Sequence, residues 1–134
     1  VIRDEARHVT FGVNYLEEFV ATLSDEEKED RAEFAYEACV VMRNRFGSDN
    51  VMKHYGWNAE EAQEVLNQSE NARLFNNLLF SKIMPNLKRI GLLTEKTIEK
   101  YEEMDILQFQ DLEDHGNIDW DELSQPLDYS SKTA

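Results

Sequence analysis

Two side chains near the start of the chain, Glu5 and His8, have the types and the spacing to bind one metal ion together. They are three residues apart, so on a helix both leave the same side, one turn from each other. Carboxylate oxygens and imidazole nitrogens are ligands that suit iron and manganese. In some four-helix bundles, two helices with such a Glu-x-x-His pair and two more with a Glu form a di-metal site.

The position of this pair on its helix favours the metal interpretation. At about 100° per residue, Glu5 and His8 share one arc of roughly 80° with an apolar stripe, which consists of Gly12, Leu16, Phe19 and Leu23. A buried carboxylate without a partner costs several kcal/mol, so Glu5 in this stripe needs a metal ion or a buried cation. Spacing alone leaves an alternative open, a surface turn with charge pairs among Asp4, Glu5, Arg7 and His8.

The hydropathy pattern places the pair on the first of several helices. Apolar residues recur at helical spacing, and Ser24, Asn58 and Thr94 are expected to cap three of the helices. The expected helices cover residues 2–23, 25–46, 48–57, 59–90 and 95–104, and Pro85 should kink or end the fourth. No segment alternates as a strand does, so the predicted fold class is all-α.

Two domains of different character follow from this pattern. Residues 1–104 form the helical domain, and residues 105–134 form an acidic tail with isolated apolar anchors, which we expect to be either partly ordered by docking or free. The chain opens on Val1 inside a helical pattern, with no capping residue and no initiator Met. A helix normally begins at a cap, so we expect this chain to be the C-terminal piece of a longer protein.

The charge and the cysteine content exclude several classes of function. Acidic residues outnumber basic ones 28 to 14, which gives a formal net charge of −14. Such a chain repels nucleic acid and anionic membrane surfaces, and no apolar run approaches the roughly 18 residues of a membrane span. The single cysteine, Cys39, excludes an internal disulfide and a cysteine-based zinc site. A reducing, cytoplasmic location fits best.

The run RDEARHVTFG, residues 3–12, resembles the last metal-binding helix of the ferritin-like di-metal carboxylate superfamily. It is most similar to the branch of the ribonucleotide reductase small subunit, its ligand-binding oxidase relatives and the di-iron N-oxygenases. The resemblance implies that Glu5 and His8 bind metal and that Asp4 holds a ligand histidine of another helix. Residues 79–93 also resemble the region after the site in bacterial members, but only the first run is a specific motif.

This resemblance implies that the chain is part of a ferritin-like helical bundle, the last metal-ligand helix with additional helices after it. A full site in the family takes ligands from four helices, whereas this chain has one Glu-x-x-His pair. The remaining ligands are therefore expected in three helices upstream of Val1. The long helical extension after the motif is similar to the larger oxidase and oxygenase branch.

The expected function is part of a non-haem di-iron (or Mn/Fe) oxidoreductase, an oxidase or oxygenase that activates O₂ and acts on a small organic substrate. The implied cofactor is two iron ions, or manganese and iron. The implied partners are the missing N-terminal helices of the same protein, a second copy of the chain in a homodimer, O₂ and a small substrate. This fragment alone is not expected to be active. Two alternatives remain, a metal-free acidic helical domain that binds a protein partner through its tail, and an iron-binding or storage protein.

Overall fold

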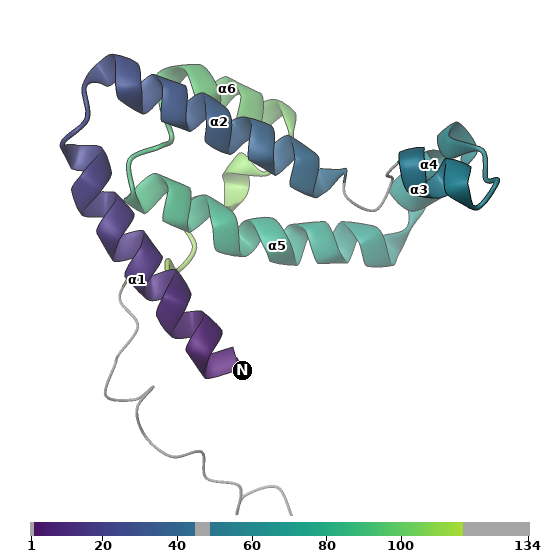
Figure 1. Cartoon of the computed structure of the whole chain (residues 1–134), viewed down its shortest axis with the longest axis horizontal. Helices are drawn as coiled ribbons and strands as arrows, with labels where there is room; N and C mark the ends of the chain where they lie inside the picture. The colour runs from purple at the N-terminus through teal and green to yellow at the C-terminus, as the bar shows by residue number, and fades with distance from the viewer. Residues whose placement is uncertain (1, 45–48, 117–134) are drawn as a thin grey trace, which may run out of the picture.

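Every regular element in the part of the chain that the computed structural model describes, residues 2–44 and 49–116, is helical. The elements are α1 (Ile2–Ala21), α2 (Asp25–Arg43), α3 (Asp49–His54), α4 (Ala59–Gln68), α5 (Glu70–Arg89), α6 (Glu95–Glu103) and the 3₁₀ turn η2 (Leu107–Phe109). In the bundle α2 and α6 lie side by side, α5 runs beneath them, and α1 packs against α5 (Figure 1). The predicted all-α class is confirmed.

The predicted helix caps are present at each of the three positions. The Ser24 hydroxyl accepts the Glu27 N–H at 3.3 Å, and the Glu27 carboxylate accepts the Ser24 N–H at 2.9 Å. Thr94 and Thr97 form a similar reciprocal pair, and the Asn58 side chain accepts two N–H groups at the start of α4. A cap acts on backbone groups within its own first turn, so the sequence predicts it without knowledge of the tertiary fold.

The long helix predicted over residues 59–90 is two helices that meet at Ser69. Ser69 has extended backbone angles (φ −70°, ψ 121°), ends α4, and caps α5 by accepting the Ala72 N–H at 3.4 Å. Of the two outcomes expected at Pro85, a kink or an end of the helix, the end does not occur, because α5 continues through Pro85 to Arg89. Pro85 is buried next to Met84, so core packing offsets the backbone hydrogen bond that the proline ring removes.

The hydrophobic core forms around the second half of α5. Phe80 and Met84 are fully buried there, and Tyr101 of α6 is fully buried beside them. The core cluster draws on α1, α2, α5 and α6 and on the segments that follow α5 and α6: Val13, Val20, Ala32, Cys39, Phe80, Met84, Leu87, Ile90, Leu92, Tyr101, Met104 and Ile106. One continuous core therefore fixes α1 relative to the rest of the bundle.

The first part of the acidic tail, as far as residue 116, docks onto α5. The Arg89 guanidinium donates from Nε to Glu17 at 3.0 Å and from Nη1 to Asp114 at 2.9 Å. The Asn86 side chain accepts the His115 backbone N–H at 2.9 Å. These contacts tie α1, α5 and the tail together. The remainder of the predicted tail, residues 117–134, lies outside the described residues.

Candidate metal-binding face of α1

The two predicted ligands, Glu5 and His8, lie one turn apart in the first half of α1, and both are exposed. The i and i+3 spacing directs both side chains to the same side of the helix, as predicted. Asp4 also lies within α1, but its side chain is not among those that the structure describes. Its part in holding a histidine of another helix therefore stays a prediction.

The face of α1 that packs against the bundle differs from the one that the sequence favoured. Thr10, Val13 and Val20 are buried, and their spacing defines an arc next to the predicted stripe. Leu16 and Phe19, which belong to that stripe, are exposed, and so is Glu5. The described residues of this chain therefore leave Glu5 exposed. The apolar arc of α1 is wider than the contact that α5 makes with it, so part of the arc stays uncovered.

The uncovered part of α1 forms a continuous apolar surface around the two predicted ligands. Its large side chains are between 40% and 69% exposed, and they are Val9, Phe11, Tyr15, Leu16 and Phe19. The three rings form a stacked row along the helix, with centroids 6.2 Å apart from Phe11 to Tyr15 and 6.3 Å apart from Tyr15 to Phe19. We call these five residues with Glu5 and His8 the open face of α1. Contiguous apolar surface of this kind is typical of a docking site.

An apolar groove adjoins the open face on the side of α5. It has a volume of about 490 Å³, and Val9 of α1 contributes to its wall. The other lining residues come mostly from α5 and are apolar, including Phe75, Leu78 and Ile83, with Lys82 at the edge. The apolar surface therefore continues from α1 across to the middle and second half of α5.

The donor set of the open face fits part of an iron or manganese site. One carboxylate and one imidazole from the same helix can bind one ion, and both atom types suit these metals. Within the described residues, no group of three or more His, Cys, Asp or Glu side chains lies close enough together to hold a metal ion. Any further ligands to an ion at Glu5 and His8 would have to come from outside the described part of the chain.

The other two histidines have surroundings that do not resemble a metal site. The Asn86 amide donates from Nδ2 to His115 Nδ1 at 2.9 Å, while its Oδ1 accepts the His115 backbone N–H. His115 thereby helps to dock the tail. His54 is exposed at the end of α3 and packs edge-on against Tyr55, with ring centroids 5.2 Å apart. We assign structural roles to both.

A buried polar pair, Tyr101 and Cys39, lies in the core between α2 and α6. Tyr101 packs edge-on against Tyr36 with ring centroids 5.6 Å apart, and its hydroxyl has no hydrogen-bond partner in the described structure. Burial raises the pKa of Tyr101, and the neighbouring Cys39 thiol raises it further. Burial also raises the pKa of Cys39. Both groups are therefore held in their neutral forms in the folded protein.

These two groups predict a loss of stability at alkaline pH. The unfolded chain ionises at the ordinary values of about 8.5 for Cys and 10 for Tyr, whereas the folded chain does not. The free energy of unfolding should therefore fall as pH rises above these values. We expect Tyr101→Phe to unfold with a free energy equal to, or about 1 kcal/mol above, that of the wild type at pH 7, because it removes an unpaired buried hydroxyl.

The advantage of Tyr101→Phe should widen above pH 10, as measured by urea unfolding across the alkaline range. Tyr55→Phe is the matched control, because Tyr55 is exposed. Parallel pH profiles for wild type and Tyr101→Phe would show that the Tyr101 hydroxyl ionises as readily in the folded protein as in the unfolded chain.

Sequence reasoning missed several residues that the structure brings together. Arg89 joins α1, α5 and the tail through Glu17 and Asp114, which are 72 and 25 residues away from it. Arg43 and Arg73, from α2 and α5, line one pocket although they are far apart in sequence. The excess of acidic over basic residues was the one sequence feature that indicated that a single arginine could pair with several carboxylates.

Comparisons of the chain with protein-family models, with curated proteins and with solved structures find no match. In the part of the chain that the structure describes, no helix is both long enough and apolar enough to cross a membrane.

Proposed function

We propose that this chain is the C-terminal part of a ferritin-like di-iron or manganese–iron oxidoreductase, in which Glu5 and His8 bind the metal. The complete protein would activate O₂ and oxidise a small organic substrate. The proposal is supported by one observation above all, the position of Glu5 and His8 in the open face of α1. The resemblance of residues 3–12 to the last metal-binding helix of that superfamily supports it independently.

The apolar surroundings of the pair carry the physical argument. Five large apolar side chains exposed on one helix are stabilised when another element covers them. The same covering element would also remove Glu5 from water. A buried carboxylate is costly unless a cation or hydrogen-bond donors compensate it. A metal ion shared with His8 provides that compensation, and the covering helices would supply the remaining ligands.

The two side chains have distinct roles in this arrangement. Glu5 provides an anionic oxygen that lowers the net charge of the site, and His8 provides a neutral nitrogen ligand. When bound, the metal pair supplies the redox chemistry with O₂. In the simplest oxygenation, one oxygen atom enters the substrate and the other leaves as water, while an external reductant supplies two electrons and the solvent two protons. The apolar groove beside Val9 offers an apolar surface against which an organic substrate could pack.

The metal content of the longest native form of the protein tests the proposal. Elemental analysis should find about two iron or manganese ions per chain, and Glu5→Ala and His8→Ala should each lose most of this metal. Both side chains are exposed in the structure, so neither substitution should reduce the helical content measured by circular dichroism. Loss of metal without loss of helix separates ligand removal from unfolding.

Glu18→Ala is the matched control for these variants. Glu18 is an exposed carboxylate on the same helix, but it lies ten residues from His8, which is about 15 Å along the helix axis, so it cannot share an ion with Glu5 and His8. It should keep the full metal content. If the native protein holds no stoichiometric metal, or if Glu5→Ala keeps as much metal as Glu18→Ala, the proposal is wrong, and the open face serves only to dock another protein surface.

A further inference from the structure

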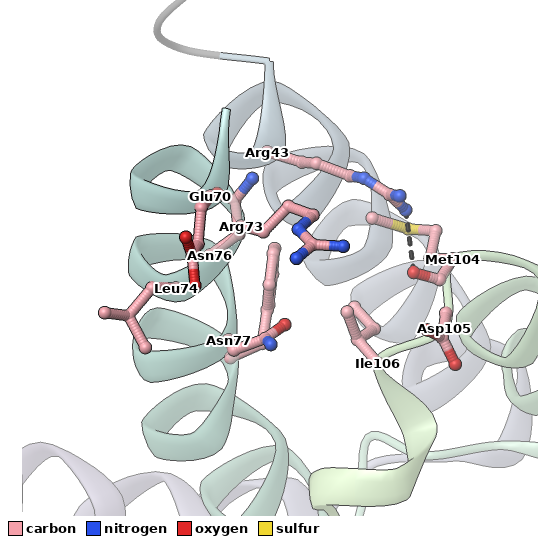
Figure 2. Close-up of a pocket in the computed structure, with 10 residues that line it drawn as sticks. Arg43, Glu70, Arg73, Leu74, Asn76, Asn77, Met104, Asp105 and Ile106 are labelled. Atoms are coloured by element: carbon pink, nitrogen blue, oxygen red, sulfur yellow. Dashed lines mark hydrogen bonds between the residues drawn. The ribbon is translucent and has the colours of Figure 1, made fainter. Parts of the chain in front are cut away.

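A second pocket lies away from α1, between the first half of α5, the end of α2 and the turn after α6. Its volume is about 460 Å³, which is the size of a site for a small organic molecule. None of its lining residues belongs to α1, so it is separate from the open face. Figure 2 shows the side chains that line it, among them Arg43, Glu70, Arg73, Asn76, Asp105 and Ile106.

Two guanidinium groups, those of Arg43 and Arg73, line this pocket. Arg43 donates from Nη1 to the Met104 carbonyl at 2.7 Å, which fixes the side chain and leaves its other N–H groups available (Figure 2). The Arg73 guanidinium points into the space between α5 and the Met104–Ile106 turn. Neither group forms an ion pair with a carboxylate of the described residues. In a chain with twice as many acidic as basic residues, two such arginines in one pocket are unusual.

Two carboxylates, Glu70 and Asp105, also line the pocket, but neither forms an ion pair with these arginines among the described residues. Asp105 Oδ1 accepts a hydrogen bond from Gln108 Nε2 at 3.3 Å, so this carboxylate already has a donor. Glu70 lies in the first turn of α5, where the positive end of the helix dipole stabilises it. The donors of Arg43 and Arg73 therefore stay available for an anion that enters the pocket.

The rest of the lining is suited to the body of an organic ligand. Phe80, Met104 and Ile106 are buried and form an apolar floor. The Asn76 amide also lines the pocket, and its Oδ1 is buried without a hydrogen-bond partner in the described structure. A buried acceptor of this kind is stabilised by a donor. The pocket therefore combines two arginines that can bind an anion, an apolar floor, and the Asn76 Oδ1 acceptor, which has no donor in the described structure.

We propose that this pocket binds a small organic carboxylate, with the carboxylate group between Arg43 and Arg73 and the apolar body against Phe80 and Ile106. The planar fork of a guanidinium matches a carboxylate in geometry. A single negative charge suits the site better than the double charge of a phosphate, because the carboxylates of Glu70 and Asp105 also line the pocket. This assignment does not depend on a metal at Glu5 and His8.

Binding of acetate, hexanoate and benzoate to the full chain tests the proposal, with NMR titration as the readout. Hexanoate or benzoate should bind saturably at millimolar concentrations and shift the methyl signals of Ile106 and Met104. Acetate, which lacks an apolar body, should bind more weakly, and benzyl alcohol, which lacks the charge, should not saturate. Arg73→Gln should weaken binding about tenfold, because it removes charge-assisted hydrogen bonds.

Arg31→Gln is the matched control, since Arg31 is exposed, pairs with Asp30 and lies outside the pocket. It should leave the affinity unchanged. Arg73 is exposed, and its side chain forms no hydrogen bond or ion pair within residues 2–44 and 49–116, so Arg73→Gln should unfold at the wild-type temperature. Failure of all three carboxylates to bind, equal weakening by Arg31→Gln and Arg73→Gln, or tighter binding of inorganic phosphate than of benzoate would each overturn the proposal.

Discussion

Replacing Phe80 with alanine is expected to lower the free energy of unfolding by about 3–5 kcal/mol. The ring is fully buried at the centre of the core, where α5 packs beneath α2 and α6 (Figure 1). Its removal costs the transfer free energy of the ring and leaves a cavity that the neighbouring Met84 and Tyr101 cannot fill without moving. Urea denaturation at neutral pH, followed by circular dichroism, measures the change.

This effect is large in comparison with the total stability of a domain of this size. Single domains unfold with a free energy of about 5–15 kcal/mol, so Phe80→Ala removes a substantial part of it. Leu78→Ala on the same helix is the control, because Leu78 is 61% exposed, and it should change the free energy by less than about 0.5 kcal/mol. Equal effects of the two substitutions would show that α5 does not pack with Phe80 inward.

The second large effect is expected from Arg89→Met, which should lower the free energy of unfolding by about 2 kcal/mol. The Arg89 side chain is only 21% exposed and donates to both Glu17 and Asp114. Burial alone would lower the pKa of Arg89, but its hydrogen bonds to Asp114 and Glu17 together raise that pKa above the ordinary value. Methionine keeps the aliphatic stem but leaves two carboxylates without their cation.

The loss of stability in Arg89→Met should be largest in the segments that the Arg89 side chain joins. A Cβ atom at Gly116 would overlap the Arg89 guanidinium, which shows how closely the tail approaches it. In Arg89→Met, hydrogen exchange of the backbone amides should accelerate most in residues 106–116 and least in α6. Arg31→Met is the control, because Arg31 pairs with Asp30 on the exposed surface, and such pairs contribute little. A uniform loss of protection over all helices would refute this role for Arg89.

The features that the sequence determined are those that depend on neighbouring residues. The all-α class follows from the spacing of apolar residues, and the starts of α2, α4 and α6 follow from the caps Ser24, Asn58 and Thr94. Each cap bonds to backbone groups within three residues of itself. The spacing of Glu5 and His8 is also local, so the helix alone places both side chains on one side.

The tertiary structure alone decided which surfaces are covered and which distant side chains meet. The apolar arc of α1 offers two overlapping faces, and only the position of α5 selects the one with Thr10, Val13 and Val20 for burial. Pro85 stays helical because packing around it offsets a lost hydrogen bond. Arg89 bonds to Glu17, and Arg43 and Arg73 line one pocket, across segments whose approach no local pattern encodes. Such contacts depend on how whole helices pack, and that is a property of the complete core.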